Sequence, residues 1–91
     1  MLVKYFAYYR NDTGRKEERL PAPETVGALL RLLVGRYGKA MGEKLLSTDG
    51  SSLGPDAIVL VNGRNIAHIG MLDTPLVDTD TVSIFPIVAG G

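Results

Sequence analysis

Apolar and polar residues alternate at the start of the chain, as they do in a β-strand with one buried face. Over residues 2–9, Lys4 marks the outer face, and Phe6 lies on that same face. A turn signal follows at residues 10–14, and the charged residues 15–20 are predicted to return as the edge strand of a hairpin. The predicted inner face of the first strand consists of Val3, Tyr5, Ala7 and Tyr9.

A run of apolar residues at helical spacing follows the strand-breaking sequence Pro-Ala-Pro at residues 21–23. Thr25 is placed to cap the N-terminus of this helix, and Gly38 marks its predicted end. The apolar residues form one stripe, which predicts that the helix packs on a sheet. The stripe consists of Val26, Leu29, Leu30, Leu33 and Tyr37.

The second half of the chain has a less regular pattern. Residues 39–56 are predicted to be mainly loop, with a short helical turn at residues 45–46 that closes one end of the core. Residues 57–61 are an unbroken apolar run typical of a strand, and the Asn-Gly dipeptide after them favours a two-residue hairpin turn. Residues 64–66 are therefore predicted to begin a short return strand.

The last strand, residues 81–85, has Val82 and Ile84 on its inner face and Phe85 on its outer face. The order of elements predicts an α+β domain of the β-grasp, or ubiquitin-like, fold, with one main helix across a mixed sheet of about five strands. In that fold the first and last strands are adjacent and parallel, which would bring Phe6 and Phe85 onto one exposed surface. Two exposed aromatic rings predict a binding partner.

Composition favours a single globular domain over residues 1–91, with residues 87–91 as an extended flexible tail. The chain is 45% hydrophobic, and its ten basic residues balance ten acidic ones. Without a basic excess, neither nucleic acid nor an anionic membrane surface is an expected partner. The sequence also lacks an apolar run of membrane-spanning length and the charge pattern of a signal peptide, so we expect a cytoplasmic protein.

Side chains that commonly carry catalysis are sparse in this sequence. There is no cysteine, one histidine and no serine in a nucleophile-elbow sequence. His68 is expected to be an ordinary loop residue, because one histidine without carboxylate partners does not form a metal site. The aspartates that follow it are expected to form turns: Asp73, Asp78 and Asp80. We therefore predict a protein that is not an enzyme and that binds no metal or cofactor.

The end of the sequence offers a different kind of chemistry. Gly90 and Gly91 have no Cβ, so the tail is thin enough to enter a narrow channel, and residues 88–91 can extend about 13–14 Å. A carboxylate is a poor acyl donor, but adenylation with ATP and Mg²⁺ would give its carbonyl a good leaving group. A sulfur donor could then displace AMP and leave a C-terminal thiocarboxylate. The alternative interpretation is that two glycines simply fray at the surface.

Five segments of the sequence carry a family resemblance: VKYFAYYR, ETVGALLRLL, LVNGRNI, TPLVDTD and VSIFPIVAGG. Together they resemble the MoaD/ThiS family of ubiquitin-like sulfur carriers, and more closely its MoaD branch, which includes the small subunit of molybdopterin synthase. The loop HIGMLDTPL is similar to that of MoaD-related proteins from archaea and some bacteria. Two residues depart from the family pattern, because Thr79 replaces a frequent glycine and Ile87 replaces a frequent second proline.

The resemblance implies a carrier protein with several partners. An adenylyltransferase similar to the ubiquitin-activating enzyme would use ATP and Mg²⁺ to adenylate Gly91, with Gly90 as a spacer, and a sulfur donor system would supply the sulfur. The large subunit of molybdopterin synthase would then accept the tail, so that sulfur reaches the pterin precursor of the molybdenum or tungsten cofactor. The partner-binding residues that the resemblance implies are Phe6, Phe85, Ile66, Ile87, Val88 and Ala89.

The sequence leaves three other functions open. A ubiquitin-like modifier would join Gly91 to lysines of target proteins through the same activated carboxylate, and a carrier could instead serve thiamin, cysteine or thiolated-tRNA synthesis. A plain β-grasp interaction module would bind through Phe6 and Phe85 and make no use of its tail. Loss of Gly91 distinguishes this last function from the first two.

Overall fold

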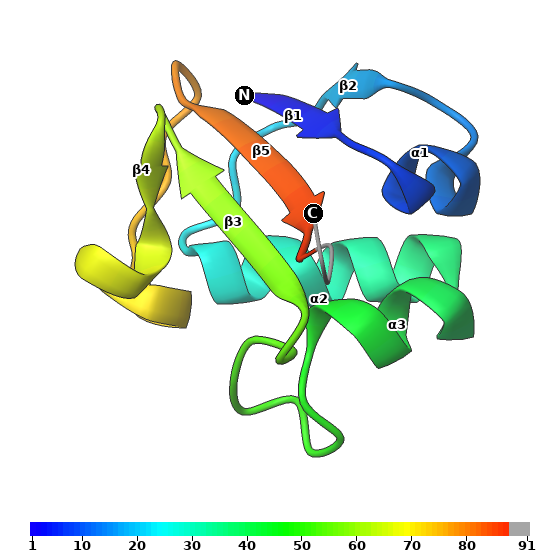
Figure 1. The fold of residues 1–91 in the computed structure, drawn as a ribbon. Helices are drawn as coiled ribbons and strands as arrows, with labels where there is room; N and C mark the ends of the chain where they lie inside the picture. The colour runs from blue at the N-terminus through cyan, green and yellow to red at the C-terminus, as the bar shows by residue number, and fades with distance from the viewer. Residues whose placement is uncertain (88–91) are drawn as a thin grey trace.

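The structure is a computed structural model that describes residues 1–87. It contains a five-stranded mixed sheet in the order β2-β1-β5-β3-β4, with the main helix α2 crossing one face (Figure 1). The predicted α+β arrangement is confirmed. The strands are β1 (Leu2–Tyr5), β2 (Glu17–Arg19), β3 (Ala57–Val61), β4 (Arg64–Asn65) and β5 (Thr81–Pro86). The helices are α1 (Tyr8–Thr13), α2 (Val26–Tyr37) and α3 (Lys39–Leu45), with 3-10 turns η1 (Ile66–His68) and η2 (Met71–Asp73).

The first and last strands lie side by side at the centre of the sheet. β1 pairs with β5 in parallel, so that Tyr5 lies opposite Ile84, and β5 pairs with β3 in antiparallel orientation. The adjacency and parallel direction of these two strands, which were expected from the predicted β-grasp fold, are therefore confirmed. Because β5 has a partner on each side, it ends at Pro86 in the middle of the sheet and not at a free edge.

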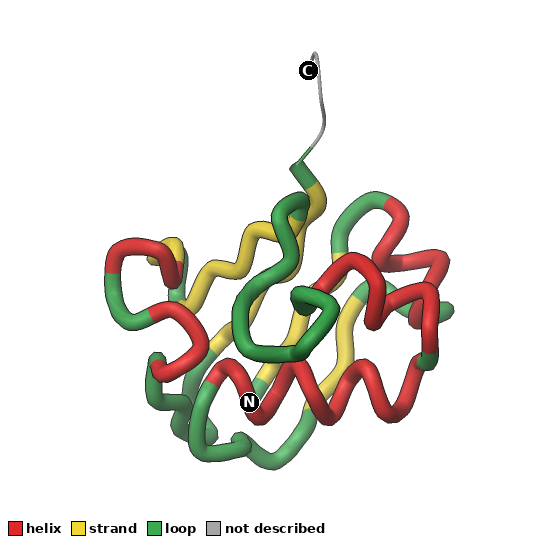
Figure 2. Tube along the Cα trace, turned by 90° about the horizontal axis from the view of Figure 1, so that it is seen from below, coloured by secondary structure: helices red, strands yellow, loops and turns green. Residues whose placement is uncertain are grey.

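The core lies between α2 and the inner face of the sheet. The Thr25 hydroxyl oxygen accepts the N–H of Ala28 at 3.2 Å, which confirms the predicted N-cap, and α2 ends at Tyr37. Seen from below, the helices lie over the strands that they cover (Figure 2). The apolar side chains that α2 buries completely in this layer are Val26, Leu29, Leu30 and Leu33.

The first strand is shorter than its alternation predicted. Ala7 has a φ of 52°, which ends the extended conformation, and the carbonyls of Phe6 and Ala7 then accept the N–H groups of Tyr9 and Arg10. Residues 8–13 consequently form α1 in place of the expected strand end and turn. Tyr9 is still buried, but as a helical residue, whereas Ala7 is exposed and the prediction that it faces inward is wrong.

Two further boundaries differ from the sequence prediction. The segment expected to be mainly loop contains α3, a helix of seven residues, because Met41 and Leu45 both reach the core. Asn62 and Gly63 adopt φ values of 51° and 81°, as the predicted tight turn requires, but the return strand has only two residues. Within residues 1–87, no helix combines the length and apolar character needed to cross a membrane.

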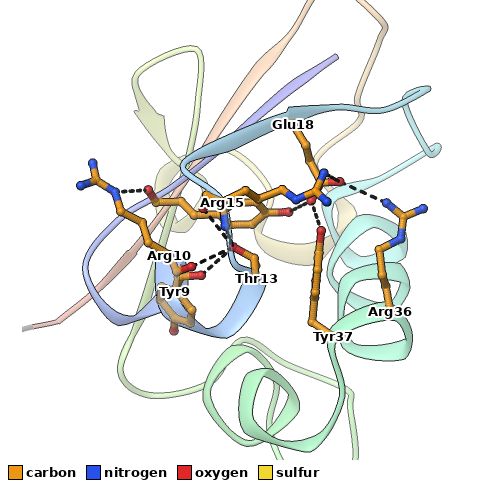
Figure 3. Close-up of polar contacts among 8 residues, drawn as sticks. Tyr9, Arg10, Thr13, Arg15, Glu18, Arg36 and Tyr37 are labelled. Atoms are coloured by element: carbon orange, nitrogen blue, oxygen red, sulfur yellow. Dashed lines mark hydrogen bonds and ion pairs between the residues drawn. The ribbon is translucent and has the colours of Figure 1, made fainter.

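A buried carboxylate joins the β1–β2 hairpin to α2. Glu18 is only 8% exposed although it lies on an edge strand, and its Oε2 accepts a hydrogen bond from the Tyr5 hydroxyl at 2.6 Å and another from the Tyr37 hydroxyl. Its Oε1 accepts from Arg36 at 3.1 Å and lies 3.5 Å from Arg15 (Figure 3). Burial favours the neutral acid, but the tyrosine hydrogen bonds and the two arginines outweigh it and lower the pKa of Glu18.

Two buried tyrosines offer a matched test of this network. The Tyr5 hydroxyl donates to Glu18, whereas the Tyr9 hydroxyl has no hydrogen-bond partner in residues 1–87. Tyr5→Phe should lower the free energy of unfolding by about 1.5–3 kcal/mol, because a charged acceptor loses a buried donor. Tyr9→Phe should change it by less than about 0.5 kcal/mol or raise it, since an unsatisfied polar group is removed. Denaturant unfolding measures both, and equal losses would contradict this assignment.

Candidate functional site

The two phenylalanines predicted to lie on one surface do so. The Phe6 N–H donates to the Ile84 carbonyl at 3.1 Å, which continues the parallel register of β1 and β5 by one residue. The two rings consequently stack, with centroids 4.0 Å apart and planes inclined by 10°. Both side chains are partly exposed on the sheet face opposite α2. Their position is thus confirmed, and their role in binding stays a prediction.

Two aliphatic residues extend this surface along β3. Ile58 lies opposite Phe85 in the β3–β5 pair, Leu60 lies opposite Ser83, and both are partly exposed. Sequence analysis did not single them out, although the unbroken apolar run of β3 carried the signal. A strand with one solvent-facing side usually alternates with polar residues, so the absence of alternation indicates that both sides are apolar. We call Phe6, Phe85, Ile58 and Leu60 the outer apolar face.

Ile66, which the family resemblance implied as a partner-binding residue, is not part of the outer apolar face and is not accessible to a partner. The Asn65 side-chain oxygen accepts the N–H of Ala67 at 2.9 Å and turns the chain from β4 into η1. This turn directs the Ile66 side chain into the core, where it is completely buried. A longer return strand would have kept residue 66 in the sheet, and β4 ends one residue too early for that.

Ile87 lies where the chain leaves the sheet. Its N–H donates to the Asp56 carbonyl at 2.7 Å, which fixes the first residue after β5, and its side chain is 49% exposed. The exit of the tail is therefore held next to Phe85 and the outer apolar face. The remaining predicted tail residues, Val88, Ala89, Gly90 and Gly91, lie outside the described residues.

The described residues contain little that could support catalysis or metal binding by this chain itself. No group of three or more histidine, aspartate or glutamate side chains is placed to hold a metal ion in residues 1–87. His68 is exposed in η1. The Asp80 carboxylate accepts the N–H of Val77, three residues earlier, as a turn-forming residue does, whereas the Asp78 carboxylate accepts the N–H of the distant Ala22. The candidate site is therefore a binding surface that adjoins the start of the tail.

Known proteins with similar sequences are carriers and modifiers. The small archaeal modifier protein 3 of Haloferax volcanii is 40% identical over 91 residues, covering 98% of this chain and 96% of the relative. A protein of Archaeoglobus fulgidus whose name proposes a sulfur-carrier role is 45% identical over 67 residues, covering 74% of each chain. Both names describe non-enzymatic proteins, in agreement with the sequence prediction.

Structural comparison and the family model give the same classification. A chain in the crystal structure of the Amycolatopsis orientalis BexX/CysO complex superposes with a TM-score of 0.82 at 26% identity, covering 99% of this chain and 98% of that one. Such a match over the whole chain confirms the ubiquitin-like β-grasp fold. The model of the ThiS family matches residues 3–91, nearly the full sequence. The chain therefore belongs to the ThiS family.

Proposed function

We propose that this chain is a ubiquitin-like sulfur carrier whose Gly91 carboxylate is converted to a thiocarboxylate. The observation that carries the proposal is the position of the tail exit. β5 occupies the centre of the sheet, ends at Pro86, and delivers Ile87 beside the stacked pair Phe6 and Phe85. A partner that binds the outer apolar face would thus lie next to Ile87, the residue from which the tail continues.

The chemistry divides between this chain and its partners. The Gly91 carboxylate would attack the α-phosphorus of ATP in an adenylyltransferase, releasing pyrophosphate and forming an acyl-adenylate. A hydrosulfide equivalent from a sulfur donor would then displace AMP and leave the thiocarboxylate. Mg²⁺ and ATP belong to the activating enzyme. The carrier contributes the acyl group, and its docking energy positions that group for reaction.

The acceptor that we propose is the pterin precursor of the molybdenum or tungsten cofactor, reached in the large subunit of molybdopterin synthase. The support for this acceptor is the MoaD-like pattern of the segments VKYFAYYR and VSIFPIVAGG. To test it, the thiocarboxylated chain is mixed with a large synthase subunit and the pterin precursor. Sulfur transfer to the pterin supports this route, and transfer only to other acceptors excludes it.

A second function is favoured by one relative. The small archaeal modifier protein 3 of H. volcanii aligns with 98% of this chain, so attachment of Gly91 to lysines of other proteins is also open. Proteomic analysis of cells that make this chain separates the two functions. Lysines that carry a Gly-Gly remnant dependent on this protein support a modifier, and a thiocarboxylate without such remnants supports a carrier.

Binding to the activating enzyme should depend on the outer apolar face. Phe85→Ala removes one ring of the stack and should raise the Kd for the adenylyltransferase by about 10- to 100-fold, since buried aromatic anchors dominate interfaces. Val77→Ala is the matched control, because Val77 is an apolar residue that is 58% exposed outside this face. Isothermal titration calorimetry measures both, with thermal unfolding to verify folding. Equal effects from the two substitutions would count against the proposed surface.

A further inference from the structure

Arg10 is a positioned cation at the border of the outer apolar face. Its Nε donates to the Tyr5 carbonyl at 3.0 Å, and its guanidinium carbon lies 5.5 Å from the centre of the Phe6 ring. Phe6 stacks in turn on Phe85. The Arg10 guanidinium, the Phe6 ring and the Phe85 ring therefore lie one after another, next to the start of the tail. Arg10 is therefore held by two contacts although it is exposed.

Arg10 has no acidic side chain as an ion-pair partner in the part of the chain that the structure describes. Arg15 and Arg36 both pair with Glu18, while Arg10 forms no ion pair within residues 1–87. The one acidic residue of α1, Asp12, is already bound by Lys44 at 2.7 Å. Figure 3 shows the Arg10 guanidinium extending away from Glu18 and its arginines. Its terminal nitrogens thus remain available as donors.

The chemistry of these donors indicates what binds them. A guanidinium presents a planar set of N–H groups that matches a carboxylate in bidentate geometry. A cation that is already held in place loses less conformational entropy when it pairs, which favours binding. A partner that covers the adjoining aromatic rings would also take Arg10 into a less polar setting, where an unpaired charge is costly.

We infer that the adenylyltransferase that activates the tail presents a carboxylate to Arg10, next to an apolar pocket for Phe6 and Phe85. This inference rests on the proposed function and specifies the chemistry of its first partner. Arg10 acts here as a docking residue, since five residues of the chain separate β5 from the end of the tail. Its loss should therefore weaken binding without slowing the chemical step.

The test is ATP–pyrophosphate exchange by the cognate adenylyltransferase, with this chain as the varied substrate. Arg10→Glu should raise KM by at least about tenfold and leave kcat within about twofold, because one close charge pair becomes repulsive. Arg10→Gln, which only removes the charge, should give an intermediate KM. Arg64→Glu is the matched control, since Arg64 is exposed on β4 at the far edge of the sheet and its substitution changes the net charge equally.

The outcomes separate this inference from the proposed function. If the wild-type chain supports no exchange, the proposed function itself fails. If the wild-type chain is active, the KM of Arg10→Glu is compared with those of wild type and of Arg64→Glu. A KM equal to either one excludes a docking role for Arg10 and leaves the proposed function intact. Should Arg10→Glu fold poorly, Arg10→Gln decides the question by the same comparison.

A second experiment changes the enzyme. When its acidic surface residues are replaced one at a time with arginine, the replacement at one position should restore binding of the Arg10→Glu chain. Restoration at none would exclude a carboxylate partner.

Discussion

Removal of Gly91 should abolish adenylation and thiocarboxylate formation while the domain remains folded. The deletion withdraws the reacting carboxylate by one residue, or about 3.3–3.6 Å in an extended chain. Since misplacement by about 1 Å already costs about 100-fold in rate, the loss should exceed 100-fold in kcat/KM for ATP–pyrophosphate exchange. The core and the outer apolar face are built entirely from residues before Ile87, so thermal unfolding should be unchanged.

A second variant separates the effect of tail length from the effect of a side chain on the last residue. Gly91→Ala keeps the carboxylate at the same position in the chain but adds a Cβ, so it should retain part of the activity if the tail enters a narrow channel. Full activity of the shortened chain would show that the reaction does not require the carboxylate at Gly91. Binding of a partner by the shortened chain, with no adenylation of the full-length chain, would instead favour the β-grasp interaction module.

Replacement of the buried Glu18 by alanine should destabilise the domain more than replacement of an exposed residue on the same strand. The change leaves the Tyr5 and Tyr37 hydroxyls without their acceptor and Arg36 without its partner. Leaving a buried hydroxyl without its acceptor typically costs about 1–3 kcal/mol, and two hydroxyls lose theirs here, so the expected loss in the free energy of unfolding is about 2–4 kcal/mol. Glu17→Ala on the same strand is the control, because Glu17 is exposed and should change stability by less than about 0.5 kcal/mol.

The contribution of Glu18 should also depend on pH in a defined direction. Its pKa is lowered in the folded protein below the ordinary value of a glutamate, so its ionised form binds the network more strongly than the neutral acid. The stabilisation is complete above the unfolded pKa and is lost as the pH falls through the lower folded pKa. Glu18→Gln resembles the protonated acid, so the difference in unfolding free energy between wild type and this variant should be largest near pH 7. A difference that stays constant down to pH 2 would contradict the lowered pKa.

The sequence predicted those features that depend on local pattern and parity. Phe6 and Phe85 could be placed together because each lies on the outer side of its strand and the two strands pair in parallel. The cap at Thr25 and the tight turn at Asn62 followed from residue types with well-defined backbone preferences. The cap and the turn required no knowledge of distant contacts, whereas the pairing of the first and last strands was expected from the predicted fold.

The features that the sequence did not predict depend on tertiary contacts or on local turns of the backbone that interrupt a strand. Glu18 lies in a charged segment typical of an exposed edge, and its burial requires Tyr37 and Arg36 from α2. Ile66 is buried because Asn65 ends β4 early, and Ala7 is exposed because a positive φ interrupts the first strand. Likewise, the contact of Arg10 with Phe6 exists only because α1 forms at that point.

The most direct test of the central claim is fragmentation mass spectrometry of the intact chain after incubation with ATP, Mg²⁺, the adenylyltransferase and a sulfur donor. Our proposal predicts that one oxygen is replaced by one sulfur and that the exchange maps to Gly91. Omission of ATP should prevent it. An exchange that maps to another residue, or no exchange with an enzyme shown to be active on a related carrier, would contradict the claim.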